Sequence, residues 1–373
     1  MRHLLAPILL SVAQLPQAAL AQSSVSSLLS DWRPYTAAQA WEVSDAVAVK
    51  KFDSDWSSGF SPKDGNNVSL MRLRAGIGME NEHWSIGWEV RQEASLDANR
   101  DALEAVRLYK QRIDPAPGTK FDASARLTSW SAQGMRVAHS FDGPTLAGNT
   151  PHLKISGTLY TRPQLRENVV SGSVLYTPTA SYSFNAAQTD ANSRYRYDNQ
   201  PMRGEPNASG TSLSLEMDLP LSQSLSLKLQ FDDLWSRIRW SKLPVMQRTI
   251  NSNVTDRDSN GDVNFRPTLR GIAPQVDENF AIPRSTVAML SYRRNAWDAA
   301  AQVERWAGVT IPTLSLGRHF SWGEISTNVE TRFKTLGIGI RLGKFHLLVQ
   351  SDSLHLNEAK ALGLQASYCI ANQ

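Results

Sequence analysis

Hydrophobic and polar residues alternate one by one along most of this chain. Every second residue is apolar over Met71–Met79 and again over Trp84–Val90. The polar segment Glu80–His83 separates these two runs. Successive side chains of a β strand point to opposite faces, so two alternating runs joined by a short polar segment predict a β-hairpin over Asn67–Glu93.

The same alternation recurs through the rest of the chain. The clearest pair of runs is Ser212–Leu219 and Leu225–Asp232, which flank the turn-forming segment Pro220–Gln223. Counting such runs predicts about 14 strands, with a range of roughly 12–16. Further runs in the C-terminal third are Thr286–Arg293, Ala299–Val309, Thr313–Phe320, Ile325–Leu342, Phe345–Leu354 and Ala361–Ile370.

Two kinds of β architecture have this pattern. A membrane β-barrel turns its apolar face to lipid and its polar face to the lumen, whereas a soluble sandwich buries its apolar face as a core. Closure into a barrel removes the unpaired strand edges that lipid cannot solvate. The runs fill nearly the whole chain at hairpin spacing, without the signature of a second domain. We therefore predict an all-β fold, a closed antiparallel transmembrane β-barrel with long polar external loops.

One segment departs from the alternation. Asp97–Arg112 has apolar residues at helical spacing, with Asp97 or Asn99 as the N-cap. Because the segment falls between strands, it predicts a short helix in a loop, although a helix packed on a soluble sheet has the same pattern. Long polar loops are predicted at Phe52–Asn66, Gln188–Gly210 and Asn253–Pro283.

The first residues contain the three parts of a secretory signal peptide in order. A basic start at Met1–His3 precedes the apolar run Leu4–Ala13, and Ala19–Ala21 is a small-residue cleavage site. The alternative is a buried first helix, which Pro7 and Pro16 disfavour. The predicted division is a signal peptide at 1–21, an N-terminal segment at 22–40 and a barrel domain at 41–373.

Composition narrows the class of protein further. The 373 residues carry a formal net charge of +4, and 41% of them are hydrophobic. Beyond the N-terminus there is no apolar stretch of the ~18 residues that a membrane-spanning helix needs. The charged residues are spread along the chain, which argues against a nucleic-acid partner. The single cysteine, Cys369, excludes an internal disulfide and suits an exported bacterial envelope protein.

Aromatic residues and the last run carry a family resemblance. Five of the 11 tryptophans fall near predicted strand ends or in turns: Trp56, Trp84, Trp240, Trp297 and Trp322. This is where the aromatic girdle of a membrane interface would lie. The alternative is that these tryptophans belong to the core and the loops. The final run places Leu362, Leu364, Ala366, Tyr368 and Ile370 on one face. It resembles the terminal strand of Gram-negative outer-membrane β-barrels, and the chain resembles this broadly porin-like family. The family usually ends on an aromatic residue, whereas Cys369–Gln373 follow Tyr368 here. The resemblance implies a location in the outer membrane, in contact with lipid.

Charged residues on the polar faces of these runs are candidates for the lumen wall. Facing rows of both signs can orient small polar solutes, and the alternative is that the charges only neutralise one another. The predicted lumen-lining residues are Arg72, Arg74, Glu89, Arg91, Glu93, Glu216, Lys228, Glu330, Arg332, Lys334 and Arg341.

A short acidic segment has the spacing of a calcium loop. Asp256, Asp258, Asn260 and Asp262 supply oxygens at alternate positions, and Gly261 permits the sharp turn. The EF-hand pattern fails at its last position, where Pro267 replaces the bidentate glutamate. The segment predicts a structural calcium ion in an external loop, with a polar surface turn as the alternative. No other cofactor is expected.

One strand places a histidine and a serine together. His319 and Ser321 lie two residues apart, with Glu324 and Glu330 nearby. The arrangement resembles the His-x-Ser pair of outer-membrane lipid A deacylases, in which serine attacks, histidine is the base and a glutamate orients it. The alternative is an ordinary strand with a polar face.

These patterns lead to three functional hypotheses. The first is a non-enzymatic outer-membrane channel or porin-like protein for small polar solutes. The second is a structural or interaction barrel of an envelope assembly or secretion system. The third is an outer-membrane lipid hydrolase that uses His319 and Ser321. A soluble periplasmic β-rich protein is a more distant possibility, and the pattern leaves the oligomeric state open.

Overall fold

The structure is a computed structural model that describes residues 31–145, 148–177, 181–195, 204–252, 255–257, 263–265 and 268–369. The predicted signal peptide lies outside these residues. The strands are β1 (Arg33–Ser44), β2 (Asn66–Glu80), β3 (Trp84–Asn99), β4 (Lys120–Asp142), β5 (His152–Tyr176), β6 (Tyr182–Asn192), β7 (Asn207–Pro220), β8 (Leu225–Asn251), β9 (Thr255–Arg257), β10 (Val263–Phe265), β11 (Leu269–Ile272), β12 (Gln275–Phe280), β13 (Ser285–Arg294), β14 (Trp297–Trp306), β15 (Val309–Phe320), β16 (Gly323–Glu330), β17 (Thr335–Leu342), β18 (Phe345–Ser351) and β19 (Ala361–Cys369). The helices are η1 (Val49–Lys51) and α2 (Arg100–Gln111).

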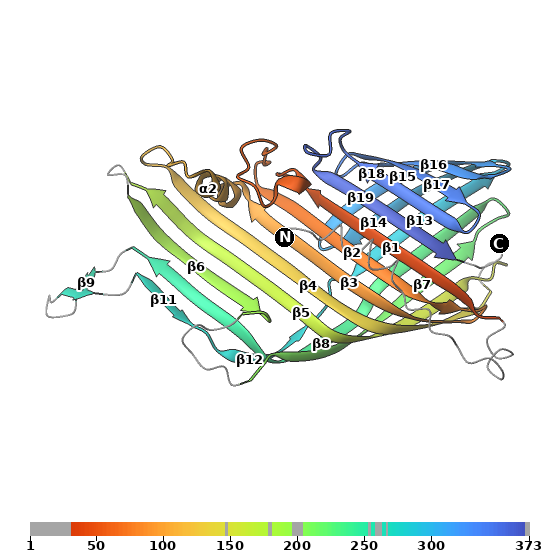
Figure 1. The fold of residues 1–373 in the computed structure, drawn as a ribbon, viewed down its shortest axis with the longest axis horizontal. Coiled ribbons are helices and arrows are strands. Elements are labelled where there is room, and N and C mark those ends of the chain that lie inside the picture. The colour runs from red at the N-terminus through yellow and green to blue at the C-terminus, as the bar shows by residue number, and fades with distance from the viewer. Residues whose placement is uncertain are drawn as a thin grey trace, which may run out of the picture.

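The strands form an antiparallel sheet that closes on itself (Figure 1). β1 pairs with β2 on one side and with β19 on the other. β6 and β7 pair in succession with β5 and β8, so together they fill one place in the ring. β11, β12 and β13 pair in succession with β8 and fill another. The ring has 14 places, and the predicted closed antiparallel barrel of about 14 strands is confirmed.

The first strand begins earlier than the sequence pattern indicates. β1 starts at Arg33, inside the 22–40 segment that we expected to precede the barrel. Apart from Pro34 and Tyr35, small and polar residues fill Arg33–Ala40, so no apolar alternation marks it as a strand. Its backbone nevertheless pairs with both β2 and β19, and these two ladders close the ring. The predicted terminal strand is confirmed as β19, and residues 370–373 lie outside the described part of the chain.

The connections distinguish the two ends of the barrel. Short turns at 81–83, 221–224, 295–296, 321–322 and 343–344 lie at one end, which we call the turn end. In the first of them, Asn81 Oδ1 accepts the backbone N–H groups of His83 (3.0 Å) and Trp84 (2.7 Å). The long connections 45–65 and 100–119 lie at the opposite end, the loop end, where β8 also ends. Outer-membrane barrels have short turns on the periplasmic side and longer loops outside, so the turn end faces the periplasm.

The predicted helix is confirmed at the loop end. α2 runs from Arg100 to Gln111, and its N-cap is Asn99, whose Oδ1 accepts the N–H of Ala102 at 3.0 Å. Ala102 and Leu103 are buried in a cluster with Trp56 of the 45–65 connection. No helix among the described residues is long and apolar enough to cross a bilayer.

One side of the wall is much taller than the other. β4, β5 and β8 have 23, 25 and 27 residues, whereas β16, β17 and β18 have 8, 8 and 7. The loop-end halves of the long strands, with β6 and β11, project beyond the ring and extend to the left in Figure 1. We call this part the projecting sheet.

The projecting sheet corrects two loop predictions. Much of Asn253–Pro283 is strand, because β11 and β12 pair with β8, and within Gln188–Gly210 the strands β6 and β7 reach Asn192 and start at Asn207. Prolines interrupt the alternation of apolar and polar residues here. Pro163 and Pro244 lie within β5 and β8 at neighbouring levels, and Pro274 separates β11 from β12. A proline lacks the N–H that continues a ladder, so it bends or interrupts a strand.

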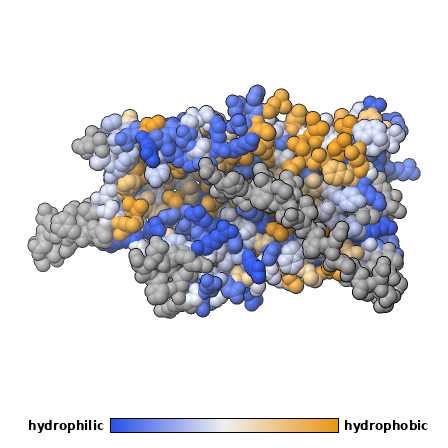
Figure 2. Space-filling model, viewed as in Figure 1, coloured by the Kyte–Doolittle hydropathy of each residue, from blue (hydrophilic) through white to orange (hydrophobic). Residues whose placement is uncertain are grey.

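The outer face of the barrel is apolar. On the short strands the outward side chains include Leu314 at 60% exposed and Ile338 at 62% exposed. Figure 2 shows hydrophobic side chains gathered over this part of the molecule, opposite the projecting sheet. A chain that folds in water would bury such a surface, whereas a barrel in lipid exposes it.

Aromatic side chains ring the turn end of the outer face. They are between 38% and 52% exposed, and all of them lie at strand ends or in turns there: Trp84, Tyr292, Trp297, Phe320, Trp322, Phe345 and Tyr368. This is the girdle that forms at a membrane interface. Trp56 and Trp240, which we also assigned to a girdle, are buried instead, because Trp56 stacks on Phe60 and Trp240 belongs to the interior. With its closed ring and apolar belt, the protein is an outer-membrane β-barrel.

Candidate functional site

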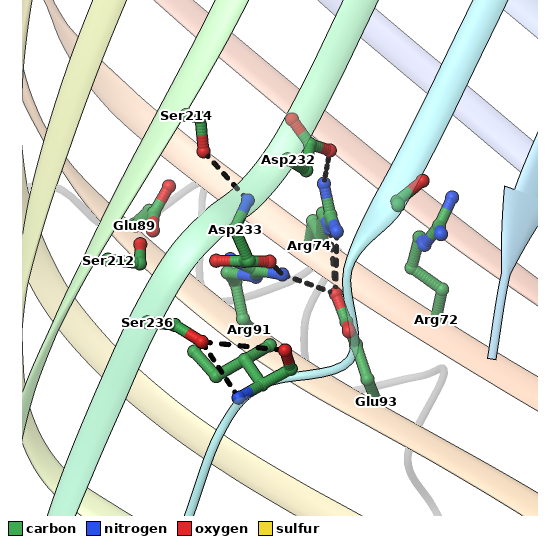
Figure 3. Close-up of polar contacts among 12 residues, drawn as sticks. Arg72, Arg74, Glu89, Arg91, Glu93, Ser212, Ser214, Asp232, Asp233 and Ser236 are labelled. Atoms are coloured by element: carbon green, nitrogen blue, oxygen red, sulfur yellow. Dashed lines mark hydrogen bonds and ion pairs between the residues drawn. The ribbon is translucent and has the colours of Figure 1, made fainter.

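Charged side chains meet inside the barrel at one level (Figure 3). Arg74 of β2 contacts two acids, because its Nη1 lies 2.6 Å from Asp232 Oδ2 and its Nε lies 2.9 Å from Glu93 Oε1. Arg91 of β3 donates to both carboxylate oxygens of Asp233, at 3.0 and 2.7 Å, and to Glu93 Oε1 at 2.8 Å. Four of the predicted lumen residues, Arg72, Arg74, Arg91 and Glu93, therefore lie together.

These ion pairs cross the lumen. Arg72 of β2 donates from Nη1 to Glu304 Oε1 of β14 at 2.7 Å, and β2 and β14 lie on opposite sides of the ring. β3 and β8, which carry Arg91 and Asp233, are separated by β4, β5 and β7. Side chains from distant strands thus bond directly across the lumen at this level. We call this set the cross-lumen network: Arg72, Arg74, Arg91, Glu93, Asp232, Asp233 and Glu304.

A distortion of β8 brings two consecutive acids to the lumen. Neighbouring residues on a regular strand point to opposite faces, so Asp232 and Asp233 would normally diverge. Asp233 has a positive φ of 53°, and the pairing of β7 with β8 shifts register between Leu213 and Leu215. The backbone N–H of Asp233 donates to Ser214 Oγ at 3.1 Å. This bulge turns both carboxylates inward, where Arg74 and Arg91 neutralise them.

The centre of the network is almost fully removed from water, whereas Arg74, Asp232 and Glu304 are partly exposed. The side chains of Arg91, Glu93 and Asp233 are 6%, 2% and 0% exposed. The guanidinium of Arg91 lies 4.9 Å from the Trp130 ring, and that of Arg72 lies 4.2 Å from the Trp306 ring. Ions buried in this way are tolerated only while each charge keeps its partners.

Apolar side chains fill the interior on the loop-end side of the network. One cluster follows Asp233 along β8 and another follows Glu304 along β14. The first contains Trp130, Tyr160, Leu165, Ile238, Trp240, Leu243, Val245, Phe280 and Ile282, and the second contains Trp41, Val43, Leu70, Trp306, Val309, Ile311 and Phe333. A layer of ion pairs and a layer of apolar side chains therefore follow one another along the barrel interior.

A polar cavity lies on the turn-end side of the network. Its volume is about 330 Å³, and we call it the turn-end cavity. Tyr35 covers part of its wall, where a Cβ on Gly87 would lie 2.4 Å from Tyr35 Oη and one on Gly78 would lie 2.7 Å away. These two glycines leave room for the tyrosine ring. The cavity is lined by Tyr35, Gln39, Arg74, Glu89, Arg91, Arg136, Thr158, Ser212, Ser214, Gln230, Asp232 and Gln365, among others.

The other predicted lumen residues fall into two groups. Glu89 lines the turn-end cavity, Glu216 and Lys228 form an ion pair, and Arg341 Nε lies 3.6 Å from Glu324 Oε2. Arg332 and Lys334 are not on a strand, because the run Ile325–Leu342 is divided by a turn at 331–334. Glu330 ends β16 and stabilises that turn, since its carboxylate accepts the N–H of Phe333 at 3.0 and 3.1 Å.

Arg332 instead joins two connections at the loop end. Its Nη1 and Nη2 each lie 2.7 Å from a carboxylate oxygen of Asp45, which also accepts from Lys63 Nζ at 2.5 Å and from the N–H of Val68 at 3.1 Å. Burial alone would raise the pKa of Asp45, but the hydrogen bonds from Arg332 and Lys63 lower that pKa to about 2. The ionised carboxylate is therefore the form that the fold stabilises.

This contact predicts a pH-dependent stability. The folded pKa of Asp45 lies below its ordinary value of 3.8, so the contribution is fully present above about pH 4 and is lost as the pH falls towards 2. Asp45→Asn should lower the free energy of unfolding at neutral pH by roughly 2 kcal/mol and flatten its pH dependence between these values. Denaturant unfolding across this range measures both. Asp64→Asn, which removes an exposed acid paired with Arg100, is the control and should leave both unchanged.

The structure does not assemble the predicted hydrolase site. His319 Nε2 lies 2.5 Å from Asp298 Oδ2, and Glu324 approaches the same pair. Ser321 lies in the turn after β15, and no hydrogen bond joins it to His319 within the described ranges. Glu330 is at the far end of β16 from this histidine. The histidine thus belongs to a cluster with two acids at the turn end.

The calcium prediction falls mostly outside the described residues. Asp256 belongs to β9, and its side chain is not described, while Asp258, Asn260 and Asp262 lie in undescribed positions. The calcium site stays a prediction.

Comparison with known proteins gives low similarity. No protein-family model and no curated protein matches the sequence. Among solved structures, the TodX deltaS2S3 mutant monoaromatic hydrocarbon channel has a TM-score of 0.44 and 10% identity, over 91% of this chain and 89% of that one. The P. putida toluene transporter TodX gives 0.39 and 10%, over 92% and 89%, and the CymD monoaromatic hydrocarbon channel gives 0.28 and 10%, over 93% and 91%. At these TM-scores the similarity carries no argument about transport by this chain.

Proposed function

We propose that this outer-membrane barrel is a gated channel for small polar solutes. The observation that carries the proposal is the polar turn-end cavity, which ends at ion pairs between opposite walls. Charged and hydroxyl groups in a narrow lumen can replace part of the hydration shell of a polar solute. The ion pairs hold the walls together when the channel is closed.

Opening requires two changes in this scheme. The ion pairs of the cross-lumen network must separate, and the apolar side chains beside Trp130 and Trp306 must move apart. Apolar constrictions exclude water until they widen, so this second barrier keeps the closed state tight. The proposal therefore predicts rare openings and a low mean current in the wild-type protein.

Refolded protein in planar bilayers and in liposomes tests the channel. We expect discrete current steps of low open probability, together with liposome swelling in a small polar solute such as glycine. Heat-modifiable gel migration verifies that the barrel is folded and inserted. Asp64→Asn at the loop end is the matched control and should behave as the wild type does. Folded, inserted protein that gives neither current nor swelling would contradict a channel and leave the structural or interaction barrel.

A further inference from the structure

The turn-end cavity contains two charged groups that the cross-lumen network does not use. Of its five charged lining residues, Arg74, Arg91 and Asp232 are paired within the network. The other two contact neutral groups, since Arg136 Nη2 donates to Ser156 Oγ at 3.0 Å and Glu89 Oε1 accepts from Tyr160 Oη at 3.1 Å. Within the part of the chain that the structure describes, neither has an oppositely charged atom within 4.0 Å. The cavity thus presents one free cation and one free anion.

The strand register explains why these two charges stay apart. Arg136 of β4 pairs with Gly87 of β3, and Glu89 of β3 pairs with Gly134 of β4. Each charged side chain therefore has a glycine as its direct neighbour on this ladder, and the Tyr35 hydroxyl lies over one of these glycines, Gly87. Arg136 and Glu89 are diagonal neighbours, whose Cβ atoms lie roughly 7 Å apart in an antiparallel pair. A small solute fits between two charges at this spacing.

The rest of the lining combines neutral polar groups with small residues and the apolar residue Trp88. It offers the amides Gln39, Gln230 and Gln365 and the hydroxyls Thr158, Ser212 and Ser214. Figure 3 shows Glu89 and Ser212 next to each other, beside Asp233. A volume of about 330 Å³ is at the small end of the range for ligand sites. Its small volume and its many hydrogen-bonding groups suit a small solute that carries polar groups.

We propose that the turn-end cavity binds a small zwitterion, an α-amino acid with a small or polar side chain. Its carboxylate contacts Arg136 and its ammonium group contacts Glu89, so the ligand neutralises both free charges. A simple anion would leave Glu89 facing the solute, and a simple cation would leave Arg136 unpaired. The assignment rests on the proposed channel function, because it names the solute that binds on the periplasmic side of the cross-lumen network.

Calorimetric titration of the folded barrel in detergent tests the site without requiring transport. The probes are L-serine, 3-hydroxypropionate, which lacks the ammonium group, and ethanolamine, which lacks the carboxylate. We expect L-serine to bind at least about tenfold more tightly than either partial probe, because each loses a charge-assisted contact. Arg136→Gln and Glu89→Gln should each weaken L-serine binding by a similar factor, and Arg136→Lys should retain part of it. Arg305→Gln, on the exposed outer face, is the control.

Three outcomes of the titration would overturn the zwitterion. Equal binding of 3-hydroxypropionate, with loss only in Arg136→Gln, would make this an anion site, and equal binding of ethanolamine would make it a cation site. Absence of binding for all three probes, in barrels that keep heat-modifiable migration, would mean that the cavity holds no such solute. L-serine binding without current or swelling would refute the channel and leave the binding site. Current without L-serine binding would support the channel and refute the binding site.

Discussion

Replacing Arg91 by methionine is expected to lower the free energy of unfolding by about 3–5 kcal/mol. Methionine has a similar length, so it fills most of the space but leaves Glu93 and Asp233 buried without their shared cation. Asp233 is fully buried, so water cannot solvate its charge. Denaturant unfolding in lipid vesicles, followed by tryptophan fluorescence and by gel migration, measures the loss.

Two further variants separate the charge effect from the loss of packing. The triple variant Arg91→Met, Glu93→Gln, Asp233→Asn removes the stranded charges and should recover much of the stability. Arg305→Met removes an exposed arginine of β14 and should change the free energy of unfolding by less than about 0.5 kcal/mol. If Arg91→Met lowers the free energy of unfolding no more than Arg305→Met does, the ion pairs of Arg91 do not stabilise the fold.

Reversing the charge of Arg72 is expected to open the lumen. Arg72→Glu places a second carboxylate against Glu304, which lies on the opposite wall. Like charges repel, so we expect the current per inserted barrel to rise about tenfold, which corresponds to a coupling of roughly 1.4 kcal/mol. Glu304→Arg should have the same effect, because it places two guanidinium groups together. Single-channel recording of refolded protein measures the open probability.

The double reversal is the decisive arm of this experiment. Arg72→Glu with Glu304→Arg restores the ion pair and should return the current towards the wild-type level. Recovery should be incomplete, because the guanidinium at residue 72 also lies over the Trp306 ring. Arg293→Glu is the matched control, since its partner Asp298 lies on the adjacent strand and this pair does not cross the lumen. Equal currents in the wild type, the two single reversals and the double reversal would show that the Arg72–Glu304 contact does not hold the lumen closed.

Local patterns in the sequence predicted much of this architecture. The alternation around Glu80–His83 located the β2–β3 hairpin, and Asn99 was one of two residues expected to begin the helix. The terminal run was placed correctly because β19 alternates as regularly as any other strand. These features depend on residues close in the chain, so periodicity and capping chemistry suffice to find them.

Features that depend on pairing between distant segments escaped prediction. The strands β11 and β12 exist because β8 supplies their hydrogen bonds, while Pro274 and Pro283 suggest a loop. Arg332 was assigned to the lumen because the run Ile325–Leu342 gave no signal of its turn. Four of the seven residues of the cross-lumen network were found in the sequence, and Asp232, Asp233 and Glu304 were missed. The pair Asp232–Asp233 at the end of an alternating run was the available signal, since two adjacent acids cannot both face the lumen on a regular strand.

The unequal strand lengths give the barrel a slanted outer rim. About 9–11 residues suffice to cross the bilayer, so β4, β5 and β8 continue well past the membrane surface, while β16–β18 end close to it. The external mouth therefore faces sideways, towards the low wall, where β14 and β15 are joined by only Ala307 and Gly308. Molecules from outside would approach along the membrane surface over this low wall, and the projecting sheet would border the far side of the opening.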